Sequence, residues 1–209
     1  MQFQIRTYIL NIFRLLLLVF VFLLPAPAGY SQARFKPERG TTFLYTVKQG
    51  EETYEFDVMV KLMMPYRSFQ FHTHHPKTMQ GEYNIANPAV KGTDVLILEL
   101  QDGINNISSG MPLWLSMRAF AELSDSGKTL LSINESALTL FKNTGKTKVK
   151  VKLKGVIKSL NCLKLTEADK FTGKLIKGRE LVVVNDPANP LVVSYKGKLN
   201  LKLKEISGK

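Results

Sequence analysis

The sequence has a single cysteine, Cys162, so no disulfide can form within the chain. The fold must therefore be held together by side-chain packing and backbone pairing. Cys162 lies in the apolar run Leu160-Asn161-Cys162-Leu163, which predicts a small buried hydrophobe rather than a reactive thiol. No cysteine lies directly after the N-terminal apolar run, where a lipid anchor would be attached, so we expect no lipid anchor there.

The sequence also lacks an apolar run of the length that a bilayer-spanning helix needs, which is about 20 residues. The longest N-terminal run is Leu15 to Leu24, and Arg6 and Arg14 are the only charges before Arg34. A basic start, a short apolar core and an exit rich in small residues are typical of a secretory signal peptide. We expect residues 1–33 to be that peptide, with cleavage after Ala33 in Ser31-Gln32-Ala33. Cleavage after Ala28 and an uncleaved membrane anchor are the alternatives.

Known catalytic signatures are missing. There is no G-x-S-x-G, no glycine-rich phosphate loop and no H-E-x-x-H, and the acidic residues are scattered. This favours a non-enzymatic protein. An enzyme is the alternative, because active sites in β folds assemble from strands that are distant in the sequence.

The net charge of +12 is unevenly distributed along the chain. Residues 34–141 hold 10 basic and 12 acidic residues, whereas residues 142–209 hold 17 basic and 5 acidic residues. For an exported protein we expect no nucleic acid partner. Anionic lipid headgroups or acidic polysaccharide of the envelope fit the basic last third, and another envelope protein is a further possible partner.

Alternating apolar and polar residues dominate the chain after the leader, and this period of two is the signature of β-strands. Phe43, Tyr45 and Val47 alternate with polar or exposed positions, and a turn at 48–52 separates them from a second alternating run that ends at Leu62. These two runs predict a β-hairpin. The further predicted strands are 67–74, 82–85, 93–100, 129–133, 137–142, 147–153, 159–165, 180–184, 191–195 and 198–206.

One short helix is predicted over residues 117–123. Ser116 can cap its start, and Gly127 suits its exit. Trp114, Phe120 and Leu123 would form its apolar anchor. About ten short strands and one helix predict a single all-β domain over residues 34–209, an antiparallel barrel or sandwich.

All three histidines lie in Phe71-His72-Thr73-His74-His75. On a strand, His72 and His74 point to one face with their Cα atoms about 7 Å apart, so both imidazoles can reach one ion. His75, before Pro76, could supply a third ligand, and such an open site suits Zn²⁺ or Cu²⁺. The alternative is a solvated polar face that ends at a turn, and the run itself contains no Cys, Asp or Glu. No other cofactor is expected.

Two strands carry a lysine face opposite an apolar face. We expect these lysines either to form a solvated outer face that discourages edge-to-edge pairing, or to bind an anionic polymer or membrane. The candidate anion-binding residues are Lys148, Lys150, Lys152, Lys154, Lys202 and Lys204.

Aromatic residues of the first strands could line a pocket for an apolar ligand, which would make the protein a lipid carrier. The alternative is that they form the core. These residues are Phe43, Tyr45, Tyr54, Phe56, Phe69 and Phe71.

Three segments together carry a resemblance: 81–89 (GEYNIANPA), 113–123 (LWLSMRAFAEL), and PLVV at 190–193 with LKEI at 203–206. With these segments the chain resembles uncharacterised exported β-proteins of Gram-negative bacteria, similar to the TapB-like and related families of unknown function. The resemblance implies a periplasmic or outer-envelope β-domain and brings no established activity or functional residues. We therefore expect a periplasmic or secreted, non-enzymatic module that binds a ligand or partner. The alternative is a metal-binding protein or metal-dependent enzyme that uses the His72–His75 strand end.

Overall fold

The computed structural model describes residues 36–63, 67–74, 76 and 78–208 of the chain. The predicted signal peptide, residues 1–33, and the predicted ligand His75 lie outside the described residues. From Lys36 onward the chain forms one compact unit. Among the described residues, no helix has both the length and the hydropathy that a membrane span requires.

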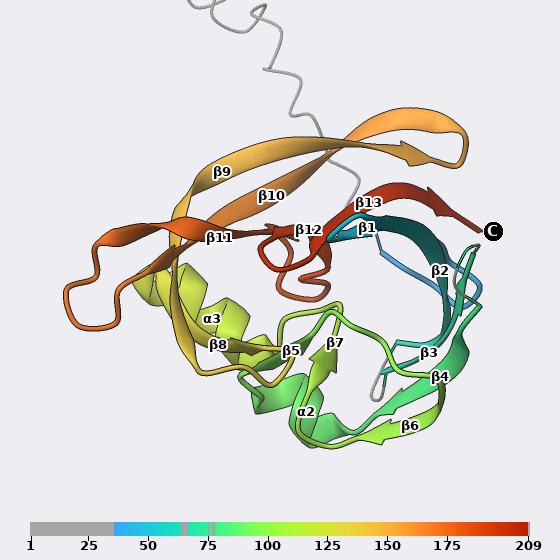
Figure 1. The fold of residues 1–209 in the computed structure, drawn as a ribbon, viewed down its shortest axis with the longest axis horizontal. Helices are drawn as coiled ribbons and strands as arrows, with labels where there is room; N and C mark the ends of the chain where they lie inside the picture. Colours follow the sequence, from blue (N-terminus) through green and yellow to red (C-terminus); the bar gives the residue numbers. More distant parts are fainter. Residues whose placement is uncertain (1–35, 64–66, 75, 77, 209) are drawn as a thin grey trace, which may run out of the picture. The chain divides into compact units, whose positions relative to one another are not determined.

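The described chain is mainly β-structure, as its alternating pattern predicts (Figure 1). The strands are β1 (Thr42–Gln49), β2 (Glu52–Leu62), β3 (Arg67–Thr73), β4 (Gln80–Ile85), β5 (Val95–Ile97), β6 (Gly103–Ile107), β7 (Met111–Pro112), β8 (Lys128–Ile133), β9 (Thr139–Leu153), β10 (Val156–Ala168), β11 (Leu175–Val184), β12 (Val192–Lys196) and β13 (Asn200–Ser207). Two helices, α2 (Asn87–Gly92) and α3 (Met117–Ser126), complete the described elements.

The strands form one mixed sheet in the order β6-β4-β3-β2-β1-β13-β12-β11-β10-β9-β8-β5-β7. Most neighbours are antiparallel, but β4–β6, β5–β7, β5–β8 and β13–β9 are parallel, so the sheet is mixed where an antiparallel one was expected. The long β9–β10 hairpin lies along β13, where Glu205 is opposite Lys152 (Figure 1). Alternation along a strand identifies its faces but not its partners, so sequence alone does not predict these parallel pairings.

The differences from the predicted elements have local causes. No strand was predicted between residues 100 and 107, but β6 (Gly103–Ile107) forms there, because its residues pair in parallel with β4. The predicted strand 93–100 contains only the three residues of β5. Helix α2 was not predicted because six residues are too few for a helical period, although Pro88 in its first turn is a typical start.

Strand β9 joins two predicted strands, 137–142 and 147–153, into one. The register of β9 with β10 shifts between Lys164 and Leu165, opposite Gly145, whose φ is 141°. A bulge of this kind bends a strand without ending it. The turn residues 143–146 therefore lie inside the strand rather than between two strands.

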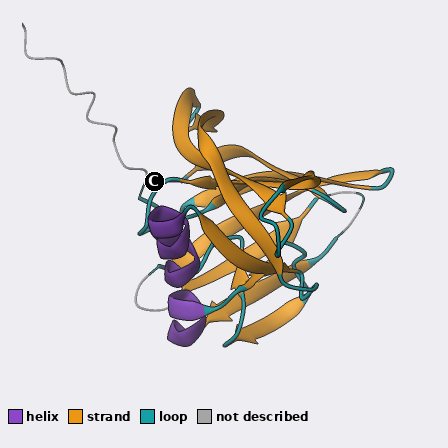
Figure 2. Ribbon diagram, turned by 90° about the vertical axis from the view of Figure 1, so that its left-hand side faces the viewer, coloured by secondary structure: helices purple, strands orange, loops and turns teal. Residues whose placement is uncertain are grey.

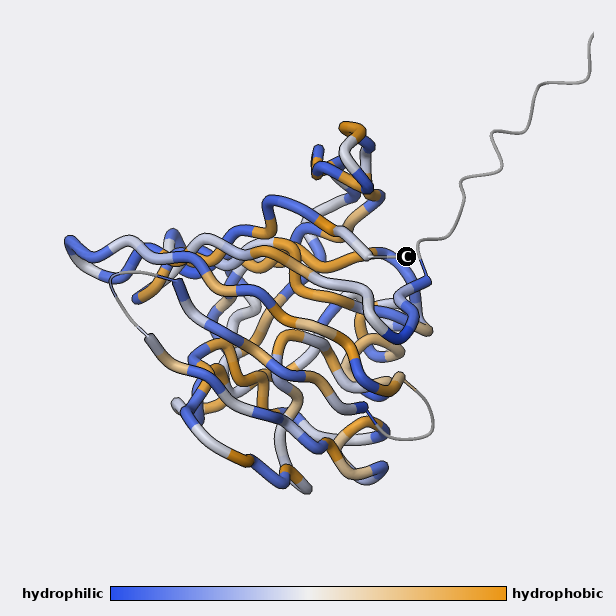
Figure 3. Tube along the Cα trace, turned by 90° about the vertical axis from the view of Figure 1, so that its right-hand side faces the viewer, coloured by the Kyte–Doolittle hydropathy of each residue, from blue (hydrophilic) through white to orange (hydrophobic). Residues whose placement is uncertain are grey.

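The predicted β-hairpin of β1 and β2 is confirmed, with Gly50 in its turn at φ 62°. The predicted inward residues Phe43, Tyr45 and Val47 are buried. On β2 the alternation holds through Val60, but Leu62 is 45% exposed because the β2–β3 register shifts between Val60 and Leu62. Figure 3 shows apolar and polar residues alternating along the strands.

Helix α3 has the predicted start and end. The Ser116 side chain accepts a hydrogen bond from the backbone N–H of Ala119, and Gly127 has the left-handed φ of 70°. Trp114, Phe120 and Leu123 are all buried, as predicted. Helices α2 and α3 lie together at one side of the sheet (Figure 2).

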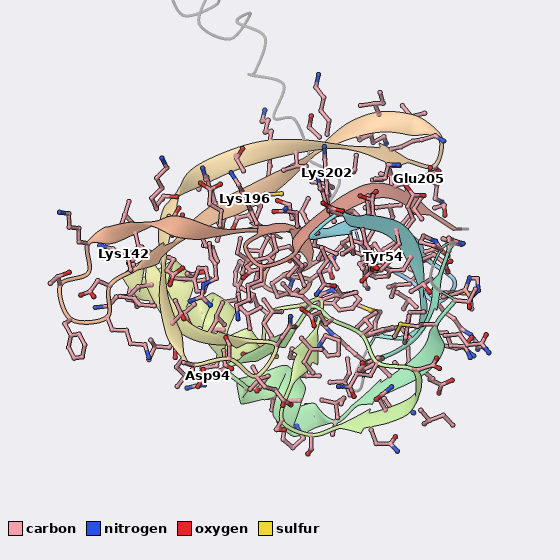
Figure 4. The ribbon with its side chains drawn as sticks, in the orientation of Figure 1. Tyr54, Asp94, Lys142, Lys196, Lys202 and Glu205 are labelled. Atoms are coloured by element: carbon pink, nitrogen blue, oxygen red, sulfur yellow. The ribbon has the colours of Figure 1, made fainter. Side chains whose placement is uncertain are left out.

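Trp114 lies at the centre of the core and is 1% exposed. Its ring centroid is 5.8 Å from those of both Phe43 and Phe69, and its indole N–H donates to Asn189 Oδ1 at 2.7 Å. The Tyr45 and Phe56 rings stack at 5.2 Å. Each such aromatic pair contributes about 0.5–1.5 kcal/mol beyond its buried area. Five of the six aromatic residues considered as a pocket lining, all but Tyr54, are thus buried in the core, and side chains crowd the space inside the curve of the strands (Figure 4).

Candidate metal centre

The β2–β3 register brings a carboxylate beside the histidine run. Asp57 is opposite His72 in the antiparallel pair. Residues directly opposite each other point to the same face of the sheet, so both side chains lie on the outer face. His74 follows the end of β3 and returns to that face two residues later, as period two predicts. The exposed fractions of the Asp57, His72 and His74 side chains are 29%, 52% and 46%.

The three side chains converge on one point. His74 Nε2 lies 3.0 Å from Asp57 Oδ1, and His72 Nδ1 lies 4.0 Å from the same oxygen. The two imidazole rings are 5.2 Å apart and nearly perpendicular, at 84°. One ligand atom from each side chain lies within 4.8 Å of the other two.

Backbone hydrogen bonds hold the histidines in place. The N–H of His74 donates to the carbonyl oxygen of Glu55 at 2.7 Å, so the β2–β3 pairing continues past the end of the strand. The Thr73 hydroxyl accepts from the backbone N–H of Met79 at 2.6 Å, and Thr73 N–H donates to the Met79 carbonyl at 2.8 Å. These bonds fix the chain on both sides of the turn after His74. The ligand positions therefore rest on paired backbone rather than on a free loop.

The charges around the cluster leave Asp57 available to a cation. The nearby Lys204 ammonium bonds Glu55 Oε1 at 2.5 Å, and Thr46 Oγ1 donates to the same oxygen at 3.3 Å. The hydrogen bond from Lys204 lowers the pKa of Glu55, and the charge of His74 acts in the same direction. Glu55 thus neutralises Lys204.

The cluster opens onto a surface hollow of about 610 Å³. Asp57 and His72 line it together with Gln70, Gln80 and Glu82. Gln70 Nε2 donates to Glu82 Oε2 at 3.1 Å, which defines the far side of the hollow. An ion at the cluster would therefore have room for water or a further ligand on the solvent side.

Two imidazole nitrogens and one carboxylate oxygen suit a transition metal. Zn²⁺ takes four such ligands at about 2.0–2.2 Å, and an open site has three protein ligands and one free position. Small rotations of half-exposed side chains would bring the present separations to that geometry. The alternative state is the direct contact between Asp57 and His74 seen here, at 3.0 Å.

The histidine prediction is thus extended by a residue that sequence reasoning missed. His72 and His74 lie on one face, as expected, and the acid absent from their own run comes from β2. Asp57 alternates with the apolar residues of the predicted hairpin, so its outward direction could be read from the sequence. Its position opposite His72 depends on the β2–β3 register.

Five of the six predicted anion-binding lysines lie on β9 and β13, two strands that pair at one end. Lys152 bonds Glu205 at 3.2 Å, Lys204 bonds Glu55, and Lys154 lies in the β9–β10 turn at φ 48°. Lys148, Lys150 and Lys202 are exposed on the outer faces of β9 and β13; Figure 4 labels Lys202 and Glu205 on β13. Acidic neighbours therefore partly neutralise this basic face, and surface pairs of this kind contribute little to stability.

Arg67 is a second functional candidate that sequence reasoning missed. It begins β3 on the inward face, is 4% exposed, and its guanidinium carbon lies 5.3 Å from the centre of the Trp114 ring. Nη2 donates to the Ala188 carbonyl at 3.2 Å, whereas Nε and Nη1 have no hydrogen-bond partner within the described ranges. Burial lowers the pKa of Arg67 to about 10. Arg67 precedes Phe69 and Phe71 at alternate positions of the same strand, so the sequence already indicated that its side chain points inward.

Cys162 is fully buried, as predicted. Burial raises the pKa of its thiol to about 12, so the thiolate is not formed near neutral pH. The comparisons with known proteins add no assignment to these sites, because no protein-family model, curated protein or solved structure matches the chain.

Proposed function

We propose that this protein is an exported β-domain of the cell envelope that binds a divalent transition metal ion, Zn²⁺ or Cu²⁺, through Asp57, His72 and His74. The observation that carries this proposal is the convergence of two imidazoles and one carboxylate within 4.8 Å. A polar solvated strand face would not require that convergence, since exposed side chains on a strand are free to point apart.

The donor set selects the class of ion. Imidazole nitrogen suits Zn²⁺ and Cu²⁺, whereas Ca²⁺ and Mg²⁺ require oxygen ligands. Three protein ligands leave at least one position for water or for a ligand from a partner. The ion would replace the direct contact between Asp57 and His74 and hold the end of β3 against β2.

The wider setting of the proposal comes from the leader and from the strand pairings. The signal-peptide pattern of residues 1–33 and the resemblance to exported Gram-negative β-proteins support a periplasmic or secreted location. We also propose that the strands curve into a single barrel or sandwich. The support is that β1 pairs along one edge of β13, whereas β12 and then β9 pair along the other edge, so the β9–β10 hairpin folds back over the sheet.

The test is calorimetric titration of the protein, isolated after export and without a polyhistidine tag, with ZnCl₂ and with CuCl₂. The double variant His72→Ala/His74→Ala should remove the binding isotherm, and Asp57→Asn should weaken affinity by about 10- to 100-fold. The matched control is Gln70→Ala, on the same face of the same strand, which should retain wild-type affinity. Equal affinity in the double variant and the wild type would overturn the proposal.

A further inference from the structure

The turn between β10 and β11 presents apolar side chains to solvent. Phe171 is 96% exposed, and Leu175 and Ile176 at the start of β11 are 51% and 41% exposed. We call residues 169–177 the β10–β11 tip. It projects at the left of Figure 1, beyond α3, and Lys170 lines a hollow together with Glu122 and Ser126 of that helix. A nearly fully exposed Phe is unusual on a soluble domain, and an exposed apolar patch marks a contact surface.

The β10–β11 tip is an ordered turn. Asp169 Oδ1 accepts from the backbone N–H groups of Phe171 and Thr172, at 3.1 and 2.7 Å, and from the Thr172 hydroxyl at 2.8 Å. Hydrogen bonds from the Thr172 backbone and hydroxyl lower the pKa of Asp169. Lys142 Nζ on β9 donates to the Gly173 carbonyl at 3.1 Å and ties the turn to the sheet. Phe171 is therefore held outward by the turn, with 96% of its surface exposed.

The charges of the β10–β11 tip are mainly basic. Lys170, Lys174 and Lys177 surround the apolar side chains, and Asp169, the one acid of the segment, is bonded within the turn. An apolar side chain at the end of a turn with lysines around it matches an anionic bilayer surface. There the ring enters the headgroup region and the ammonium groups stay with the phosphates. An acidic polysaccharide would use the lysines but gives no role to Phe171.

We propose that the β10–β11 tip docks on an anionic phospholipid surface, with Phe171 inserted and Lys170, Lys174 and Lys177 on the headgroups. The site does not include the metal cluster on β2 and β3. Each lysine near such a surface raises affinity about five-fold at moderate ionic strength, and high salt screens that contribution.

The other end of β10 offers a matched control. Val156 and Ile157, beside the β9–β10 turn, are 59% and 71% exposed and also have lysine neighbours. Strand β10 has 13 residues, so about 40 Å separates this end from the β10–β11 tip. A bilayer that receives Phe171 end-on is therefore out of reach of Ile157.

The experiment is co-sedimentation with vesicles of phosphatidylcholine alone or mixed with phosphatidylglycerol, at low and high salt. It uses the protein isolated after export, with its N-terminus established by mass spectrometry. Wild type should bind the mixed vesicles at low salt, and Phe171→Ser should lower that affinity at least ten-fold. Lys170→Glu/Lys177→Glu should do the same, whereas Ile157→Ser should stay within two-fold of wild type. Circular dichroism checks that each variant is folded.

Equal binding to neutral and anionic vesicles would overturn the proposal, and so would unchanged binding of Phe171→Ser. Retention on a sulfated polysaccharide column with no vesicle binding would overturn it as well. Loss of binding in Ile157→Ser alone would also overturn it, because it would place the contact at the opposite end of β10. Zinc titration of the Phe171→Ser protein should match wild type, so failure here and failure of the metal proposal are distinguishable.

Discussion

His74 Nε2 lies 3.0 Å from Asp57 Oδ1, across the pairing of β3 with β2. Without a metal ion this is a direct contact between partly exposed groups, and such a pair contributes little to stability. With an ion bound, both atoms become ligands and the direct contact is lost. Metal binding should therefore be visible as a change in the stability of the β2–β3 pairing.

Zn²⁺ should raise the melting temperature of the wild-type protein. Binding to the folded state alone stabilises it by about 2.7 kcal/mol when the free ion is at about one hundred times Kd. His72→Ala/His74→Ala should show no such rise, and Gln70→Ala should show the full rise. Differential scanning fluorimetry across a Zn²⁺ series provides the measurement. An equal rise in the double variant would indicate binding elsewhere on the chain.

Arg67→Met should leave stability unchanged or raise it, by up to about 3 kcal/mol. Arg67 is a buried cation with one hydrogen bond, and its Nε and Nη1 have no partner among the described residues. Methionine retains apolar volume beside Trp114 and removes the cost of the desolvated charge. Urea unfolding, followed by the fluorescence of Trp114, the only tryptophan, measures the change.

Arg67→Ala is the contrast for that prediction. It removes the same charge but leaves a cavity beside the indole, so it should be less stable than Arg67→Met by about 2 kcal/mol. If Arg67→Met were the less stable of the two, the guanidinium would be making a net favourable contribution to the core.

Trp114→Phe should destabilise the fold by about 2–4 kcal/mol. The substitution removes the indole N–H that donates to Asn189 Oδ1 at 2.7 Å. Asn189 is 3% exposed, and its Nδ2 already lacks a partner in the described part of the chain, so both ends of its amide would be unsatisfied. Urea unfolding followed by circular dichroism measures the loss. A change below 1 kcal/mol would indicate that water replaces the indole.

Glu167→Gln should lower stability near neutral pH by about 1–2 kcal/mol. Arg179 Nε and Nη2 donate to the two oxygens of Glu167 at 2.9 and 2.8 Å, and these hydrogen bonds lower the pKa of Glu167. A lowered pKa in the folded state adds stability above the ordinary carboxyl pKa, and that stability is lost as the pH falls through the folded value. The difference between wild type and Glu167→Gln should therefore shrink in acid.

Glu180→Gln is the matched control for the acid series. Glu180 pairs with Lys164 at 3.1 Å, but both side chains are more than one third exposed. Loss of this ion pair should lower the free energy of unfolding by less than about 1 kcal/mol. Melting curves of both variants between neutral and acid pH compare the two pairs, and equal costs would show that the bidentate geometry adds nothing.

Cys162 should resist thiol reagents in the folded protein. The residue is fully buried, and burial raises the pKa of its thiol to about 12. Labelling with a disulfide reagent near neutral pH should be slow in buffer and rapid in denaturing urea. Rapid labelling without urea would indicate frequent local opening of β10.

The alternation of apolar and polar residues determined much of what the sequence predicts here. It located most strands, placed Phe43 and Tyr45 inward and His72 outward, and it depends only on the period of the strand. The start and end of α3 also followed from local chemistry, because Ser116 and Gly127 act on the neighbouring backbone. The leader prediction rests on the same kind of local pattern.

The tertiary structure alone decided which strands are neighbours and which side chains meet. The parallel pairing of β13 with β9, the placement of Asp57 opposite His72, and the burial of Arg67 against Trp114 join residues that are distant in the sequence. Periodicity assigns a face but carries no information on register between strands. The Asp57–His72–His74 cluster is thus half visible in the sequence, as two histidines on one face, and is completed only by the register that brings in the carboxylate.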